Sequence, residues 1–315
     1  MVEQRNLGRS GLQVSLVGLG CNNFAGRIDF DATKAVVHKA LDLGITLFDN
    51  ADTYGDPKGG AEDYLGRILG DRRRDIVLAT KFGRPMDGSG AKQGASRRYI
   101  IDACEASLKR LRTDYIDLYW QHIEDPLTPI EETLRAMDDL VRQGKVRYVA
   151  CSTLTAWQVV EARWTAKSQN LEPYIACQER YSLLEREYEA NMAAMVEAYG
   201  LGLIPFSPLG NGLLTGKYRR NQALPPGARL TTTQRMADRY LTDRNWAIVE
   251  RLADFCASRG RTMLELAMSW LAARPAVASI IAGATRPDQL EQNVRAAEWA
   301  LSNEDMDEID RLTAN

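Results

Sequence analysis

The fold expected for this chain follows from the stretch Phe48-Asp49-Asn50-Ala51-Asp52-Thr53-Tyr54-Gly55. It begins at the end of an apolar run and places a carboxylate, Asp49, and a phenol, Tyr54, five residues apart. Two later apolar runs also end at a titratable side chain, first Lys81 and then His122. Titratable groups at the carboxyl ends of successive strands are typical of a barrel active site. An Asp, a Tyr, a Lys and a His together suit the transfer of a proton to a carbonyl oxygen.

Strand-like and helix-like patterns alternate along the rest of the chain. A small hairpin is expected around the turn at residues 8–11. Strands are then expected near residues 15–19, 45–49, 75–80, 115–121, 146–151, 174–178, 202–206 and 278–282. Helices are expected near residues 31–43, 60–70, 97–111, 128–143, 155–167, 186–199, 244–273, 287–297 and 304–312. Expected helix caps are Asp31 and Thr155 at N-termini, and Gly44, Gly144 and Gly200 at C-termini.

Eight strands joined by helical crossovers predict an α/β fold, a (β/α)₈ TIM barrel that forms one domain over residues 1–315. A doubly wound sheet is less favoured because no change in composition divides the chain in two. Two segments without clear periodicity, residues 83–96 and 207–243, follow strands. We therefore expect them to be long loops at the catalytic face.

Composition limits the classes of function. The formal net charge of −2 gives no electrostatic reason to expect binding to nucleic acid or membrane. The five cysteines are scattered and lack metal-binding spacing, which is typical of reduced thiols and predicts no metal site. No apolar run has the length of a membrane span or a signal peptide. We expect a cytoplasmic protein, and the oligomeric state cannot be read from the sequence.

Several motifs in order resemble the aldo-keto reductase family over nearly the whole chain. They are Gly18-Leu19-Gly20, Asp49 to Gly55, Ala79 to Gly83, Asp117 to Asp125, Phe206 to Gly210, Gly212 to Lys217, Gly283 to Arg286, and Gln289 to Asn293. The resemblance is to the branch that includes potassium-channel β-subunits and bacterial reductases. It implies an NADPH-dependent oxidoreductase that reduces aldehydes or ketones to alcohols.

The resemblance also implies catalytic roles. Tyr54 would be the proton donor, with Lys81 beside it and Asp49 paired to Lys81. A free phenol has a pKa of about 10, so it holds its proton at neutral pH and benefits from a cation that stabilises the phenolate. His122 would donate a hydrogen bond to the substrate carbonyl. Phe24 and Trp120 are candidates for the substrate pocket.

The resemblance assigns the NADPH/NADP⁺ contacts to a further set of residues. These are Gly20, Ser152, Gln178, Phe206, Ser207, Leu209, Gly212, Leu213, Gly216, Lys217, Gly283, Thr285, Arg286, Gln289, Gln292 and Asn293. Ser152 and Gln178 match carboxamide-binding positions, Phe206 matches the position that stacks on nicotinamide, and Arg286 matches the adenosine-phosphate motif. Three positions depart from common family residues: Thr153 replaces Asn, Phe206 replaces Tyr or Trp, and Gln292 replaces Glu.

Alternative interpretations remain open at this point. A Rossmann site at residues 18–23 lacks the third glycine, and a P-loop at 210–218 fails the required spacing. A regulatory nicotinamide-binding protein on the same barrel is the main rival to an enzyme. The presence of His122 beside the other three residues favours catalysis. A cofactor-free isomerase that uses Lys81 would leave the segments around Phe206 and Arg286 without a purpose.

Overall fold

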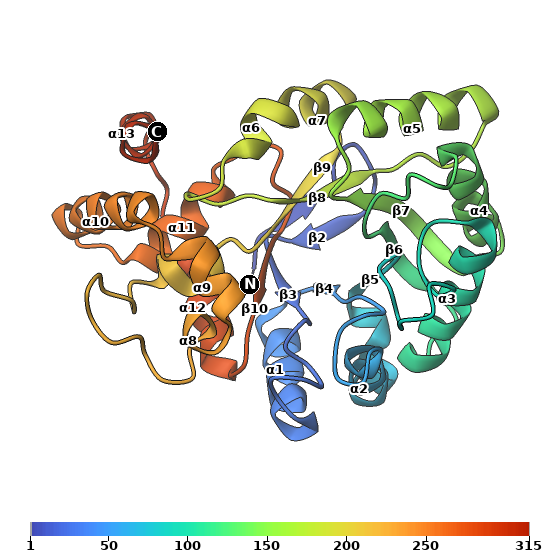
Figure 1. Cartoon of the computed structure of the whole chain (residues 1–315), viewed down its shortest axis with the longest axis horizontal. Coiled ribbons are helices and arrows are strands. Elements are labelled where there is room, and N and C mark those ends of the chain that lie inside the picture. The colour runs from blue at the N-terminus through green and yellow to red at the C-terminus, as the bar shows by residue number, and fades with distance from the viewer. Residues whose placement is uncertain (1, 315) are drawn as a thin grey trace.

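The structure is a computed structural model and describes residues 2–314. Within these residues, eight parallel strands close into a barrel in the order β10-β3-β4-β5-β6-β7-β8-β9 (Figure 1). The strands are β3 (Val17–Gly20), β4 (Leu47–Asp49), β5 (Val77–Phe82), β6 (Ile116–Gln121), β7 (Val146–Ser152), β8 (Ala176–Arg180), β9 (Gly202–Phe206) and β10 (Ile280–Gly283). The expected (β/α)₈ fold is confirmed.

A two-stranded antiparallel sheet precedes the barrel, as expected. It consists of β1 (Gln4–Asn6) and β2 (Gln13–Ser15). Leu7 and Val14 belong to the same apolar cluster as the residues that fill the barrel interior. The hairpin therefore closes the barrel at the end where the strands begin.

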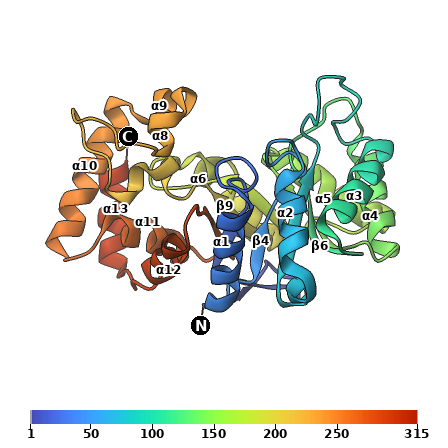
Figure 2. The same cartoon turned by 90° about the horizontal axis from the view of Figure 1, so that it is seen from below.

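The helices that surround the strands differ in length. The first five, with the short 3₁₀ segment that follows the second, are α1 (Phe30–Leu43), α2 (Gly60–Leu69), η1 (Gly70–Asp75), α3 (Arg97–Leu111), α4 (Ile130–Arg142) and α5 (Ala156–Gln169). The later ones are α6 (Glu187–Asn191), α7 (Ala193–Tyr199), η2 (Gly210–Thr215), α8 (Arg229–Thr232), α9 (Gln234–Tyr240), α10 (Asp243–Ser258), α11 (Met263–Ala272), α12 (Pro287–Ala296) and α13 (Asn303–Thr313). Helices α8 to α13 gather on one side of the barrel, opposite α3 to α5 (Figures 1 and 2).

Two expected helices are each interrupted. The helix expected at 186–199 is divided at Met192, whose φ of −127° is not helical. The helix expected at 244–273 ends at Ser258 and resumes at Met263, because Gly260 adopts a φ of +62° and Thr262 forms a new capping box with Glu265. A local turn signal thus overrides a continuous apolar pattern.

Helix caps agree with expectation at four positions and differ at one. Thr155 begins α5 with a capping box, and Gly44 and Gly200 end helices in the left-handed conformation. Gly144, also left-handed, directly follows the end of α4. The prediction of Asp31 as N-cap is wrong: the side chain of Asp29 accepts from the Ala32 N–H, and Asp31 lies in the first turn.

The strand period of two sorts the side chains between the barrel interior and the helices. The interior cluster includes Leu47, Ala79, Leu118 and Trp120 from β4 to β6, with Ala150, Ala176 and Ile204 from β7 to β9. The small alanines leave room for the indole of Trp120, which is fully buried. The next inward-facing residue of each strand lies directly above this apolar layer, toward the carboxyl ends of the strands.

The packing of α2 against α3 depends on Gly66. A Cβ at Gly66 would lie 2.5 Å from the Arg110 carbonyl oxygen and 2.6 Å from the Leu111 carbonyl carbon. We predict that Gly66→Ala lowers the free energy of unfolding by about 1–3 kcal/mol, as overpacking does. Urea unfolding measures this change. Gly11→Ala is the control, because a Cβ at Gly11 would have no neighbouring atom of residues 2–314 within 4 Å; an equal effect from both would refute the packing argument.

Candidate active site

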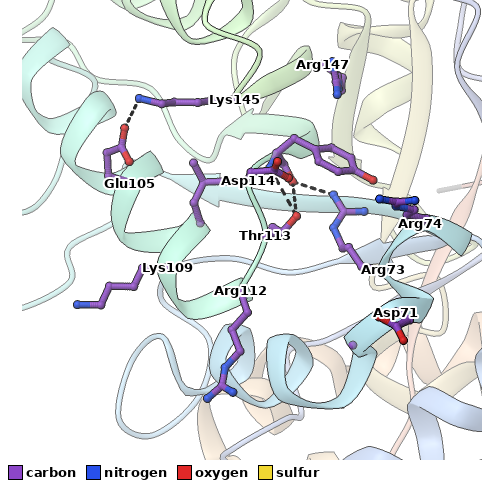
Figure 3. Close-up of a pocket in the computed structure, with 13 residues that line it drawn as sticks. Asp71, Arg73, Arg74, Glu105, Lys109, Arg112, Thr113, Asp114, Lys145 and Arg147 are labelled. Carbon is purple, nitrogen blue, oxygen red and sulfur yellow. Dashed lines mark hydrogen bonds and ion pairs between the residues drawn. The ribbon is translucent and has the colours of Figure 1, made fainter.

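Two large hollows on the protein differ in position and in chemistry. One, of about 1440 Å³, lies where β5, β6 and β7 begin and is lined by residues such as Arg73, Lys109 and Arg147. Figure 3 shows Lys109 and Arg112 extending away from Arg73, and Lys145 paired with Glu105. Its charged groups do not converge on a common point, and this end of a barrel contributes to stability rather than catalysis.

The second hollow, of about 760 Å³, lies at the carboxyl ends of the strands. Asp49, Tyr54 and His122 line it, whereas Lys81 is fully buried directly behind them. The hollow has the size of a small-molecule site and the position of the active site in barrel enzymes. We refer to it as the cavity.

The strand period explains why distant residues meet at this cavity. Each residue two positions beyond the interior apolar layer also faces inward. This relation connects Leu47 to Asp49, Ala79 to Lys81, Trp120 to His122, Ala150 to Ser152, Ala176 to Gln178, and Ile204 to Phe206. Strand pairing then places these residues side by side; for example, Ser152 pairs with Gln178 across β7 and β8.

A buried ion pair lies at the centre of the site. Lys81 Nζ is 2.5 Å from Asp49 Oδ2 and donates to the Asn50 carbonyl oxygen at 2.8 Å. The other carboxylate oxygen of Asp49 accepts a hydrogen bond of 3.0 Å from Gln178 Nε2. Asp49 therefore has partners on both oxygens, and Gln178, expected at the nicotinamide, also supports the ion pair.

Tyr54 and His122 lie next to this pair. Lys81 Nζ is 5.1 Å from the centroid of the Tyr54 ring, and the ring centroids of Tyr54 and His122 are 6.2 Å apart in an edge-to-face arrangement. The four residues expected to act together are thus gathered in one place from β4, the loop after it, β5 and the end of β6.

The electrostatics of the site keep Lys81 charged and Tyr54 protonated. Burial opposes the charge of Lys81, but the interactions with Asp49 and Tyr54 together outweigh it and raise the lysine pKa. Burial also raises the pKa of Tyr54, and the nearby Lys81 charge reduces this effect only in part. A phenol that stays protonated at neutral pH next to an ammonium group is suited to release a proton to a developing alkoxide.

His122 is neutral in this environment. Burial, followed by the charges of Lys81 and Arg84, lowers its pKa to about 2. Its backbone N–H donates to the Phe82 carbonyl oxygen at 2.9 Å, while Nδ1 has no partner among residues 2–314. A neutral imidazole at the cavity can donate one hydrogen bond to a carbonyl oxygen, as expected from the sequence.

Most of the residues expected to bind cofactor line the cavity. They are Gly20, Ser152, Gln178, Phe206, Ser207, Leu209, Gly212, Lys217, Gly283, Thr285, Arg286, Gln289, Gln292 and Asn293. Leu213 and Gly216 are not among the lining residues, and Leu213 is fully buried. Phe24 and Trp120, expected in the substrate pocket, are likewise not on the cavity wall, because Phe24 packs under the outer helices and Trp120 fills the barrel.

The segments after β9 and β10 form the side of the cavity where the cofactor phosphates are expected. Ser207, Asn211 and Gly212 have positive φ values of 56°, 53° and 99°, which bend the segment after β9 into the irregular η2 turn. After β10, Pro287 starts α12, and Gln289 Oε1 accepts from the N–H groups of Thr285 and Arg286 at 2.8 and 3.3 Å. The N-terminus of α12 can therefore stabilise an anion.

These residues fit the nicotinamide dinucleotide that the resemblance implies. Phe206 offers an aromatic ring near the catalytic end, and the Arg180 guanidinium lies 5.0 Å from its centroid. Lys217 and Arg286 provide positive charge at the other end. Over residues 2–314, no cluster of His, Cys, Asp and Glu side chains could hold a metal ion, and no helix is long and apolar enough to span a bilayer.

Sequence reasoning missed several residues that line the cavity. They are Asn22, Asn23, Arg27, Arg84, Glu179, Arg180, Pro225, Gly227 and Arg229. Glu179 and Arg180 are the last residues of β8, and the others follow strand ends, some of them in the two long segments that were expected at this face. The segment 207–243 is connected to the loop after β3, because Arg27 Nη2 donates to the Gly227 carbonyl oxygen at 3.2 Å.

An eight-stranded parallel barrel with a buried ion pair, a phenol and an imidazole at the carboxyl ends of its strands is the arrangement of a barrel oxidoreductase. The chain belongs to the aldo/keto reductase family, whose model matches residues 16–314. It is 36% identical over 320 residues to a probable voltage-gated potassium channel subunit beta of Oryza sativa subsp. japonica, covering 99% of this chain and 96% of that protein.

Two bacterial relatives are similarly close in length. The chain is 36% identical over 312 residues to the uncharacterized oxidoreductase YrpG of Bacillus subtilis (strain 168), covering 96% of this chain and 93% of that protein. It is 32% identical over 325 residues to the L-glyceraldehyde 3-phosphate reductase of Escherichia coli (strain K12), covering 100% of this chain and 93% of that protein.

The state of His122 can be tested directly. We predict that its imidazole remains neutral from pH 5 to 8, because the folded pKa is about 2. Below the unfolded pKa of about 6.5 the unfolded chain protonates His122, whereas the folded protein does not. The contribution of His122 to the free energy of unfolding is therefore fully present above about pH 6.5 and declines as the pH falls below it. Ring NMR signals of the two histidines, assigned with His122→Gln, provide the measurement. A titration midpoint between pH 5 and 8 for His122 would contradict the burial argument.

Proposed function

We propose that the protein is an NADPH-dependent reductase that converts aldehydes or ketones to alcohols, and that residues 1–315 act as one domain. The observation that supports this proposal most strongly is the buried Lys81–Asp49 pair, 2.5 Å long, beside Tyr54 and His122 at the head of the cavity. Bound NADPH would supply a hydride to the carbonyl carbon. The chain then has to place the carbonyl, protonate its oxygen and exclude water.

Each catalytic side chain has a distinct task in this proposal. His122, neutral and at the cavity wall, donates a hydrogen bond that orients the carbonyl oxygen. Tyr54 gives its proton to the developing alkoxide, and Lys81 stabilises the phenolate that remains. Asp49 fixes the position of Lys81 and balances its charge. General acid catalysis of this kind contributes on the order of 10²–10⁴-fold to the rate.

The cofactor contacts follow the lining of the cavity. Ser152 and Gln178 lie at the catalytic end, where they can contact a carboxamide, and Phe206 can stack on the ring. Ser207, Leu209, Gly212 and Lys217 would hold the pyrophosphate; Gly283 and the segment from Thr285 to Asn293 would hold the adenosine phosphate. Gln178 can serve the cofactor through its oxygen, because its nitrogen already donates to Asp49.

A regulatory nicotinamide-binding protein on the same barrel is the second candidate. The name of the Oryza sativa relative supports it. Binding of NADPH is common to both candidates, so only turnover separates them. The complete set of Asp49, Tyr54, Lys81 and His122 around one cavity favours the enzyme.

The first test removes the phenol oxygen. Tyr54→Phe should lower kcat by about 10²–10⁴-fold with small aldehydes, because it removes only the proton donor. The NADPH dissociation constant, measured by nicotinamide fluorescence, should change little. Lys81→Met should also be severe, and the double variant should lose much less than the two single losses combined, since the residues act together. Tyr64→Phe, a phenol that packs on Phe30 outside the cavity, is the control. Normal turnover by Tyr54→Phe would exclude it as the proton donor.

The second test concerns the choice of cofactor. We predict that NADPH binds more tightly than NADH and that Arg286→Ala narrows the difference by roughly 10- to 150-fold, the value of a charge-assisted hydrogen bond. Arg286 now pairs with Asp288 at 3.0 and 3.1 Å in an exposed position, so a 2′-phosphate would have to replace this partner. Dissociation constants for both cofactors are the measurement, with Arg295→Ala on the same helix as the control. Equal affinities in the unmodified protein would refute this role.

A further inference from the structure

The cavity has more positive charge than the proposed cofactor requires. Its lining includes six cationic side chains: Arg27, Arg84, Arg180, Lys217, Arg229 and Arg286. Among residues 2–314 only two acids line it, and neither balances this charge. Asp49 is paired with Lys81, and burial raises the pKa of Glu179 to about 7, so that at neutral pH it is only partly ionised. The chain as a whole has a net charge of −2, so the positive charge is specific to this cavity.

Four of the cations, Arg27, Lys217, Arg229 and Arg286, form one connected group, of which Arg229 also interacts with Tyr54 at the catalytic end. After burial, the charges of Arg27 and Arg286 lower the pKa of Lys217, and the charge of Arg27 lowers that of Arg229. These side chains are therefore close enough to repel one another. The pyrophosphate and the 2′-phosphate of NADPH together have about four negative charges, which would balance this group.

Arg180 has partners within the protein. Its Nη1 donates to the Tyr240 hydroxyl at 3.0 Å, and its Nε is 3.7 Å from Glu185 Oε1. Glu185 is itself buried. Arg239 also pairs with Glu185 at 2.7 Å, so this carboxylate is shared by two guanidinium groups, and Arg180 is held in position rather than fully neutralised.

Arg84 is left without a counter-charge in the described part of the chain. It follows β5 after Gly83, is half-buried, and lines the cavity close enough to His122 for its charge to act on that imidazole. Between residues 2 and 314 it forms no hydrogen bond or ion pair through its side chain. It also does not belong to the group around Lys217, so the cofactor phosphates do not account for it.

The backbone around Arg84 is held in place. The Phe82 carbonyl oxygen accepts from the His122 N–H at 2.9 Å, and the Gly83 carbonyl oxygen accepts from the Gly94 N–H at 2.8 Å. On the other side of Arg84, the Pro85 carbonyl oxygen accepts from Lys58 Nζ at 2.7 Å. The backbone that holds the Arg84 guanidinium is therefore fixed, and it lies next to His122, which orients the carbonyl.

We propose that the substrate is an aldehyde or ketone with an anionic group, a carboxylate or a phosphate, and that Arg84 binds this group while His122 holds the carbonyl. The inference rests on the proposed reductase function and names its substrate class. A guanidinium recognises either anion through two parallel hydrogen bonds. The cavity that remains beside His122 once a cofactor is bound is therefore specific for small, charged carbonyl compounds.

The test compares matched pairs of aldehydes. Succinic semialdehyde is compared with butanal, and glyceraldehyde 3-phosphate with glyceraldehyde, so that a carboxylate and a phosphate are examined separately. In the unmodified protein, kcat/KM should be roughly 10- to 150-fold higher for at least one anionic member than for its neutral partner. Arg84→Gln should abolish most of this preference through KM, and Arg84→Lys should restore part of it.

Two controls separate specific recognition from general electrostatics. Arg147→Gln removes the same charge at the opposite end of the barrel and should leave the preference intact. Binding of succinate or inorganic phosphate to the NADP⁺ complex, measured by calorimetry, should weaken in Arg84→Gln but not in Arg147→Gln.

If Arg84 acted only by keeping His122 neutral, Arg84→Gln would lose equal activity with neutral and anionic aldehydes, which would overturn the inference. Turnover of neutral aldehydes with no anionic preference would overturn it and leave the reductase intact, whereas a lack of turnover with every aldehyde would overturn both.

Discussion

The buried pair of Lys81 and Asp49 is the constraint on which the rest of the site depends. Lys81 has no exposed surface, and an ammonium group in such a place is tolerated only with close counter-charges and hydrogen bonds. Asp49 Oδ2 and the Asn50 carbonyl oxygen provide them, and Gln178 satisfies the second oxygen of Asp49. Loss of one partner from such a pair typically destabilises a protein by about 3–5 kcal/mol. The pair therefore also fixes the relative positions of β4, β5 and β8.

The β5 strand that holds Lys81 is anchored on its outer face as well. Thr80, which points away from the barrel interior, donates to Glu62 Oε1 at 2.5 Å. The other oxygen of Glu62 accepts from Arg110 Nε at 2.7 Å, so α2, α3 and β5 are joined by one buried network. The Asp52 N–H donates to the Lys81 carbonyl oxygen at 3.1 Å, which fixes the loop that leads to Tyr54. An ion pair on the inner face of β5 and a hydrogen bond on its outer face thus hold Lys81, and the backbone bond to Asp52 connects it to the loop that leads to Tyr54.

The sequence predicted the parts of the molecule that follow a repeating pattern. The alternation of strand-like and helix-like patterns identified the barrel. The titratable residues at the ends of apolar runs, together with the family resemblance, identified Asp49, Lys81 and His122. The interruption at Gly260 was not predicted because the apolar pattern continues through it, while one left-handed glycine and the Thr262 cap end the helix. Asp29 rather than Asp31 caps α1 for a similar reason: both are acidic, and only backbone geometry distinguishes them.

The charge of the cavity was harder to predict because it arises in irregular segments. Arg27 and Arg84 lie in loops, and Arg229 begins the short helix α8 within a segment without periodicity. Their sequence neighbours do not show which way each side chain points. Phe24 and Trp120 were expected in the substrate pocket but do not line the cavity. The sequence could not distinguish the two locations, since an aromatic residue is equally compatible with a pocket wall and with a barrel core. In this molecule both rings lie in the core, and the wall of the cavity, apart from Tyr54 and Phe206, is largely polar and basic. Because unbalanced positive charge inside a cavity opposes folding, its presence is best explained by ligands that bring negative charge.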